Sequence, residues 1–142
     1  IGQGGFLEYA QMYSNFYGTP KGPVMKYLEE GKDVILEIEM QGARQVKEMY
    51  PEAVLIFVLP PSLEELRNRL TTRGTETQEQ VYERLSTSFE EIKQVKDYNY
   101  FIFNENNKTT ESAMIIENLI VAEKNKASRY EKAIIKKFEE EL

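Results

Sequence analysis

Apolar and polar residues alternate along the chain with two different periods, one typical of strands and the other typical of helices. Residues 6–19 are rich in aromatic side chains and are interrupted by Ser14-Asn15 and by Gly18. This pattern predicts two short strands joined by a tight turn, which would form a small antiparallel sheet.

Three later apolar stretches are also predicted to be strands. Residues 34–40 have a period of two, residues 54–59 form a continuous apolar run that stops at Pro60-Pro61, and residues 98–103 end at Asn104. A continuous run of this kind is typical of a strand that is buried on both faces. In the first stretch, the period of two places Leu36, Ile38 and Met40 on one face. Ile35, Glu37 and Glu39 then lie on the opposite face.

Helical periodicity and capping residues lie between the predicted strands. Proline at the start and glycine at the end predict a helix from Gly22-Pro23 to Gly31. Further helices are expected at residues 43–49, at 110–121 and in a charged tail with Tyr130, Ile134 and Phe138 at helical spacing. Two more helices are expected to begin with a capping box, one at Ser62/Glu65 and the other at Thr77/Gln80. Strands that alternate with helices predict an α/β fold with a parallel sheet.

Composition excludes several kinds of chemistry. The chain has no cysteine and no histidine, which rules out disulfides, thiolate nucleophiles, Ser/His centres and histidine metal sites within these 142 residues. A formal net charge of −6 and a pI near 4.9 argue against nucleic-acid binding. No apolar run approaches the roughly 20 residues of a membrane span, and no signal peptide opens the chain, so we expect no membrane association and a cytoplasmic location.

Carboxylates follow the predicted strands, where open parallel sheets bind their ligands. Glu37 and Glu39 share one face at such an end, although a strand that simply emerges into water explains them slightly better from spacing alone. A guanine edge offers an N1–H and an exocyclic amine, and a carboxylate accepts from both while it rejects adenine. Glu8, Glu37 and Glu39 are therefore candidates for guanine recognition.

Arginines gather around the connection at residues 71–78. They are Arg67, Arg69, Arg73 and Arg84, and Arg69 and Arg73 are four residues apart. Arginine suits phosphate oxygens and the charge of phosphoryl transfer. The alternative is surface pairing with Glu65 and its neighbours, worth a few tenths of a kcal/mol per pair. Asn104 at a strand end can meet a base or a ribose, but asparagine is equally a common turn residue.

Several runs together resemble the guanylate kinases, which belong to the P-loop class of nucleoside monophosphate kinases. The GMP-binding region of that family is matched by Phe-Leu-Glu-Tyr-Ala at 6–10, Asn-Phe-Tyr-Gly-Thr at 15–19 and Ile-Leu-Glu-Ile-Glu-Met-Gln-Gly at 35–42. The resemblance continues through Leu-Pro-Pro-Ser at 59–62 and Arg-Gly-Thr-Glu-Thr at 73–77 to Asn104, so that it covers nearly the whole chain.

The resemblance implies an enzyme that transfers a phosphoryl group from ATP to GMP with Mg²⁺. It assigns the guanine or the GMP phosphate to Glu8, Tyr17 and Thr19. Glu37 and Glu39 fall where the family often has aspartate at the base of the nucleotide crevice, and the guanine contact of Glu37 is a weaker expectation than that of Glu8. The phosphate-bridging lid and hinge arginines correspond to Arg69, Arg73 and Arg84, with Arg69, Arg73 and Asn104 on the ATP side.

The implied fold is a three-layer parallel sheet flanked by helices, with a small antiparallel GMP-binding subdomain and a helical lid. We expect a GMP-binding region at 1–33, a core at 34–70, a lid at 71–88, and core and C-terminal helices at 89–142. No Gly-Lys-Ser/Thr sequence is present, and the chain opens directly in a glycine-rich turn. We therefore expect an incomplete kinase without its amino-terminal phosphate loop, which binds GMP at most and is monomeric, homodimeric or associated through open sheet edges.

Two alternatives remain at this stage. One is a guanylate-kinase-like module that binds phosphorylated peptides without catalysis, although the retention of residues on both nucleotide sides favours the enzyme. The other is a different nucleoside monophosphate kinase, which shares the α/β scheme but gives no reason for Glu8 and the Tyr17-Gly18-Thr19 set.

Overall fold

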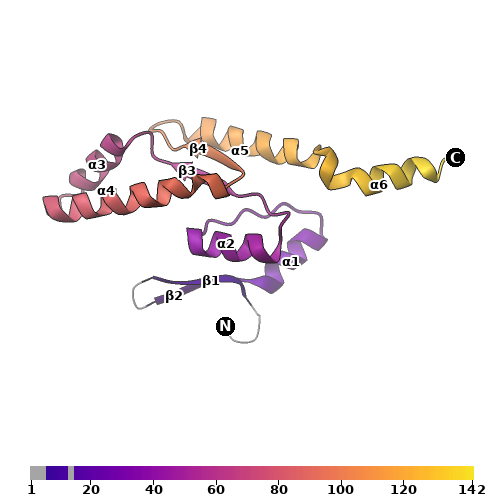
Figure 1. Ribbon diagram of the computed structural model, residues 1–142, viewed down its shortest axis with the longest axis horizontal. Coiled ribbons are helices and arrows are strands. Elements are labelled where there is room, and N and C mark those ends of the chain that lie inside the picture. Colours follow the sequence, from indigo (N-terminus) through magenta and orange to yellow (C-terminus); the bar gives the residue numbers. More distant parts are fainter. Residues whose placement is uncertain (1–5, 13–14) are drawn as a thin grey trace. The chain divides into compact units, whose positions relative to one another are not determined.

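The protein has an α/β fold that divides into two compact units, Ile1–Leu55 and Ile56–Leu142. A computed structural model describes residues 6–12 and 15–142, with side chains described from Gly18 onward (Figure 1). Each unit has its own small sheet, one antiparallel and the other parallel. The predicted α/β class is confirmed at this level.

The first unit opens with two antiparallel strands, β1 (Phe6–Met12) and β2 (Asn15–Pro20), as the aromatic pattern predicts. Their register places Glu8 opposite Thr19 and Ala10 opposite Tyr17. The predicted tight turn between the strands lies outside the described residues.

Helix α1 (Lys21–Glu29) follows β2, with Pro23 in its first turn. Its end is a Schellman motif, because the Gly31 amide donates to Leu28 O at 3.0 Å and the Lys32 amide donates to Tyr27 O at 3.0 Å. Gly31 has a φ of 79°, a left-handed conformation that glycine adopts without strain. The predicted start and stop of this helix are both confirmed.

The strand predicted at residues 34–40 is wrong, because this segment joins neither of the two sheets among the described residues. A strand requires a hydrogen-bonded neighbour, which a local pattern cannot supply. The alternation of the side chains is nevertheless present: positions 34, 36, 38 and 40 are half-buried, and positions 35, 37 and 39 are exposed.

Helix α2 (Met40–Met49) begins three residues before the predicted position and includes the last residue of the predicted strand. Val46 of α2 packs with Val24 of α1 in the core of the first unit. The half-buried side chains of the extended segment complete this core: Val34, Leu36 and Ile38, joined by Tyr50 and Ala53. The extended segment therefore contributes to packing without contributing to a sheet.

The second unit contains a parallel pair of strands, β3 (Ile56–Leu59) and β4 (Tyr100–Phe103), in which Ile56 pairs with Tyr100 and Leu59 with Phe103. Parallel pairing is as predicted, and both strands are shorter than the apolar runs. Burial on both faces is wrong for the first run, since Val58 is 52% exposed. A strand is buried on both faces only where helices cover each side of the sheet, and in the described residues the face that carries Val58 is incompletely covered.

Two helices connect β3 to β4 by way of a short 3₁₀ helix. They are α3 (Leu63–Thr72) and α4 (Gln78–Ile92), which lie side by side, and the 3₁₀ segment is Lys93–Asp97. Leu70 of α3 packs between Val81 and Leu85 of α4, and each is at most 7% exposed. The apolar side chains of α4 are only partly buried, because Phe89 is 48% exposed.

The chain ends in α5 (Thr109–Lys124) and α6 (Ala127–Glu139). Glu123 at the end of α5 is buried, and its carboxylate accepts from Tyr100 Oη at 2.5 Å and from Arg129 Nε at 2.7 Å. The apolar positions at helical spacing in α6 are all substantially exposed: Tyr130, Ile134 and Phe138. None of the helices in the described ranges is long and apolar enough to cross a membrane.

Candidate functional site

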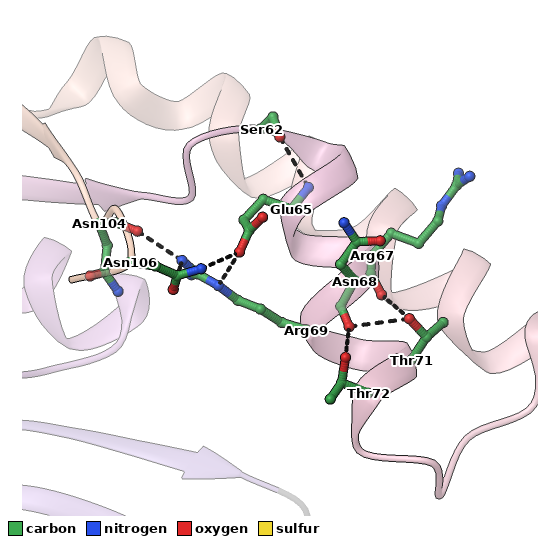
Figure 2. A network of polar contacts seen from close by, with 9 residues as sticks. All are labelled: Ser62, Glu65, Arg67, Asn68, Arg69, Thr71, Thr72, Asn104 and Asn106. Atoms are coloured by element: carbon green, nitrogen blue, oxygen red, sulfur yellow. Dashed lines mark hydrogen bonds and ion pairs between the residues drawn. The ribbon is translucent and has the colours of Figure 1, made fainter. Parts of the chain in front are cut away.

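A polar network surrounds Arg69 where helix α3 meets the loop after β4, as Figure 2 shows. Arg69 Nη2 donates to the backbone oxygen of Asn104 at 3.0 Å and to Oδ1 of Asn106 at 3.1 Å. Nε of Arg69 lies 3.4 Å from Oε1 of Glu65, and that oxygen accepts from Asn106 Nδ2 at 2.6 Å. The guanidinium is therefore held on two of its three nitrogens, by Glu65 of its own helix and by the loop after β4.

The network modifies the capping box expected at the start of α3. Ser62 Oγ accepts from the Glu65 amide at 3.0 Å, as predicted, but the Glu65 side chain points to Arg69 and Asn106 (Figure 2). The Glu65 carboxylate thus meets a guanidinium and a side-chain amide instead of the backbone amide of Ser62. At this helix, only the Ser62 half of the predicted capping box is therefore present.

The capping box predicted for α4 is complete. Thr77 Oγ1 accepts from the Gln80 amide at 3.2 Å, and the Gln80 side chain accepts from the Thr77 amide at 2.9 Å. This helix start lies next to Gly74, whose φ of 67° turns the chain after α3.

A hollow of about 250 Å³ lies beside the network. Arg69 and Asn104 both line it, together with the carboxyl end of β3 and one face of α4. Its other lining residues are mostly apolar: Phe57, Val58, Leu59, Pro60, Leu66, Ser88, Glu91 and Ile92. Two polar groups of the network thus open onto a hollow of mixed polar and apolar lining, which is smaller than the roughly 300 Å³ or more of a usual small-molecule site.

The loop after β4 has its own constraints. Lys108 Nζ lies 2.6 Å from Glu105, whose hydrogen bond raises the pKa of the lysine. Asn107 has a φ of 60°, and the Asn104 amide donates to Leu59 O at 2.7 Å. These contacts shape the turn that carries Asn106 to Arg69.

The other candidate arginines lie apart from this network. Arg84 on α4 forms an ion pair with Glu76 at 3.1 Å, and the second Glu76 oxygen is buried without a hydrogen-bond partner among the described residues. Arg73 follows the last residue of α3 and is exposed. Arg67 points away from the network in Figure 2. Only Arg69 and Asn104, of the predicted second-unit residues, are brought into direct contact.

The candidates in the first unit are Glu8, Tyr17, Thr19, Glu37 and Glu39. Thr19 lies on β2 and is half-buried, while the side chains of Glu8 and Tyr17 lie outside the described residues. Glu37 and Glu39 are exposed on the same side of the extended segment, as the period of two predicts. Glu39 is also the residue that precedes α2, so that its backbone accepts the first helical hydrogen bond, from Ala43, at 2.9 Å.

The sequence reasoning missed Asn106, and it gave Glu65 only the roles of a cap and a surface partner. The surface pairing is present, since Glu65 and Arg69 are four residues apart. Asn106 lies in a polar turn with no motif of its own, and its partner Glu65 is 41 residues away. Asn104 contributes its backbone oxygen to Arg69 rather than the amide side chain that drew attention to it.

Comparison with known proteins gives a consistent result. A sequence model of the family described as guanylate kinase matches residues 1–123. Guanylate kinase of Clostridioides difficile (strain 630) is 63% identical over 142 residues, which are 100% of this chain and 68% of that protein. Guanylate kinase of Clostridium tetani (strain Massachusetts / E88) is 48% identical over 95% of this chain and 64% of its own length.

A solved structure agrees with the sequence relatives. The crystal structure of guanylate kinase from Anaplasma phagocytophilum is similar with a TM-score of 0.69 at 35% identity, over 88% of this chain and 59% of that chain. The chain thus spans about two thirds of the length of its curated relatives and less of this structure.

Proposed function

This chain belongs to the guanylate kinase family, and we propose that it provides the GMP-recognising and phosphate-bridging parts of an ATP:GMP phosphotransferase. The observation that carries the proposal is the match of the whole chain to relatives named for this activity. The resemblance of the separate sequence runs supports the same reading, because those runs contain the candidate groups for both nucleotides.

The proposed reaction is an in-line phosphoryl transfer. A phosphate oxygen of GMP attacks the γ-phosphorus of Mg-ATP, the bond to the β–γ bridging oxygen breaks, and ADP and GDP result. No covalent intermediate forms on the protein. Positioning of the two nucleotides and arginine charge supply the catalysis, since a loose phosphoryl transition state gives a protein little other chemistry to do.

GMP recognition is proposed for the first unit. Glu8, Tyr17 and Thr19 hold the guanine or the GMP phosphate, and Glu37 and Glu39 lie at the base of the crevice. The register of β1 and β2 supports this role for Glu8 and Thr19, because it pairs their backbone positions. The exposure of Glu37 and Glu39 leaves both carboxylates accessible to a ligand.

The ATP side is proposed for the second unit. Arg69, Arg73 and Arg84 bridge the phosphates, and Asn104 lies near the adenine together with Arg69 and Arg73. The hollow lined by both Arg69 and Asn104 supports this role. Mg²⁺ enters as part of Mg-ATP; in the described part of the chain, no group of three or more acidic side chains is placed to hold a metal ion, and we assign no protein ligand to it.

The finer architecture is part of the same proposal. In the whole protein we expect a three-layer parallel sheet, with GMP binding at residues 1–33, core at 34–70, a lid at 71–88, and core and terminal helices at 89–142. The parallel pair β3–β4 supports such a sheet. The cytoplasmic location, the monomeric or homodimeric state and association through open sheet edges stay predictions.

The test is an amide-proton NMR titration of the 142-residue chain with GMP, with AMP as the control ligand. We expect dispersed peaks that GMP shifts and AMP does not. A dispersed spectrum that is indifferent to GMP contradicts guanine recognition and favours a phosphopeptide-binding module instead. We also expect no GDP formation in a coupled assay of this chain with ATP and GMP, because its sequence has no phosphate-cradling loop; robust turnover contradicts that expectation.

A further inference from the structure

We propose that Asn106, together with Glu65, is a positioning residue that fixes the guanidinium of Arg69 beside the hollow. The inference deepens the function proposed above and rests on it, because it states how one of the phosphate-bridging arginines is oriented. It starts from the network in Figure 2, which joins residues 35 to 41 positions apart in the sequence.

Some N–H groups of the Arg69 guanidinium contact the protein, and others remain available beside the hollow. A guanidinium has five N–H groups in a rigid plane. Nη2 directs its two toward Asn104 O and Asn106 Oδ1, and Nε faces Glu65. Among the described residues, Nη1 has no such partner, so its two N–H groups are the ones available to a bound phosphate or base.

Asn106 performs two tasks, accepting one hydrogen bond and donating another, that neither aspartate nor leucine combines. Its Oδ1 accepts from Arg69 at 3.1 Å, and its Nδ2 donates to Glu65 at 2.6 Å. Aspartate in this place accepts from the arginine but cannot donate, and its charge repels Glu65. Leucine has neither function. The side chain therefore links the carboxylate and the guanidinium into one unit with a defined plane.

Glu65 acts by geometry more than by charge. Its side chain is 30% exposed and that of Arg69 is 31% exposed, so solvent weakens their Coulomb attraction. Glutamine at position 65 keeps an acceptor oxygen for both Asn106 and Arg69. If orientation is the function of Glu65, the glutamine variant retains most of it.

The first experiment observes Arg69 itself in the 142-residue chain without ligand. The Nε–Hε cross-peak of Arg69 is assigned by its disappearance in Arg69→Lys. We expect a peak shifted away from exposed arginines such as Arg67 and slow to exchange with water, because Nε faces Glu65. Asn106→Leu no longer holds the Glu65 carboxylate, and Asn106→Asp repels it, so both variants should move the peak toward the exposed position. Glu65→Gln should leave it near its original place.

Matched controls separate positioning from general destabilisation. Asn118→Asp makes the same chemical change at an exposed site on α5, and Glu64→Gln removes a charge from the same turn as Glu65. Neither should move the Arg69 peak. The proposal is overturned if the Asn106 variants leave that peak unchanged, or if the controls move it equally. If the spectrum of Asn106→Leu shows that this variant is unfolded, the positions of the Arg69 peak in Asn106→Asp and Glu65→Gln test the proposal instead.

The second experiment titrates the same variants with Mg-ATP and with inorganic tripolyphosphate. Because the chain has no phosphate loop, we expect the parent to bind these ligands weakly at most, and we expect Asn106→Leu, which removes an acceptor of Nη2 without adding a charge, to weaken that binding further, about tenfold, whereas Asn118→Leu should have no effect. If the parent chain binds neither ligand, the proposed ATP side fails while the Arg69 spectrum still decides the positioning. If the variant releases Arg69 yet binds Mg-ATP as well as the parent, the positioning role is overturned.

Discussion

Glu65 and Glu123 each hold an arginine side chain of the second unit through its Nε, and they do so in different surroundings. The Glu65–Arg69 pair is 3.4 Å apart, with side chains about 30% exposed. The Glu123–Arg129 pair is 2.7 Å apart, and the Glu123 side chain is 10% exposed. Each carboxylate also accepts from a second side chain, Asn106 in one case and Tyr100 in the other.

The difference in exposure assigns the two pairs to different tasks. A buried carboxylate that loses its partners becomes costly, because it no longer has water to replace them. An exposed pair contributes little to stability, since water solvates both charges when they separate. We therefore expect the Glu123 pair to stabilise the fold and the Glu65 pair to orient Arg69 at almost no cost or gain in stability.

The largest effect is expected from Glu123→Ala. It removes the acceptor of both Tyr100 and Arg129, and we expect the free energy of unfolding to fall by about 2 kcal/mol. Urea denaturation measures this change. Glu117→Ala, at an exposed position of the same helix, is the control and should change stability by less than about 0.5 kcal/mol. Equal losses in the two variants contradict the distinction between the pairs.

The contribution of Glu123 should also depend on pH. The hydrogen bond from Tyr100, followed by that from Arg129, lowers the pKa of Glu123. A group with a lowered pKa in the folded state stabilises the protein above its unfolded pKa, and this stability is lost as the pH falls through the folded pKa. The difference in unfolding free energy between the parent and Glu123→Gln should therefore be full at pH 7 and shrink on acidification. A difference that is constant down to pH 3 contradicts it.

A smaller effect is expected at the start of α4, where an exposed cap can be compared with the exposed ion pair of α3. Thr77→Ala removes one half of a complete capping box and should cost about 1 kcal/mol, more than the loss of the Glu65 charge. Thermal and urea unfolding measure the cost. Ser86→Ala, at an exposed position inside the same helix, should not be destabilising.

The smallest effect is expected from Glu65→Gln, which should change the free energy of unfolding by less than about 0.5 kcal/mol at physiological salt. Unfolding at low and high ionic strength measures any contribution of the charge. Glu64→Gln is the control from the same helical turn. A loss as large as that of Glu123→Ala removes the contrast between the two carboxylates.

Features that depend on neighbours in the sequence were predictable. The Thr77/Gln80 box, the Gly31 helix stop and the two aromatic strands each involve groups a few residues apart, and all are confirmed. The alternating exposure at residues 34–40 also follows from the sequence alone.

Features that depend on distant partners were not predictable in this way. Residues 34–40 have a strand-like pattern, but a pattern does not provide the second strand that pairing requires. The spacing of Ser62 and Glu65 indicates a capping box, whereas the carboxylate is drawn to Asn106 from another part of the chain. The resemblance located Arg69 and Asn104, and the structure adds the backbone oxygen and the second asparagine that hold the guanidinium.

The long sequence separation within this network also affects how the protein folds. The hairpin of β1 and β2 and the helical turns need only short loops to close, which takes microseconds or less. The contact between Glu65 and Asn106 spans 41 residues, and closing so long a loop costs about 3 kcal/mol in chain entropy before any bond rewards it. We therefore expect the surroundings of Arg69 to assemble late, together with the pairing of β3 and β4 that closes a loop of similar length, so that the orientation of this arginine reports the folding of the second unit.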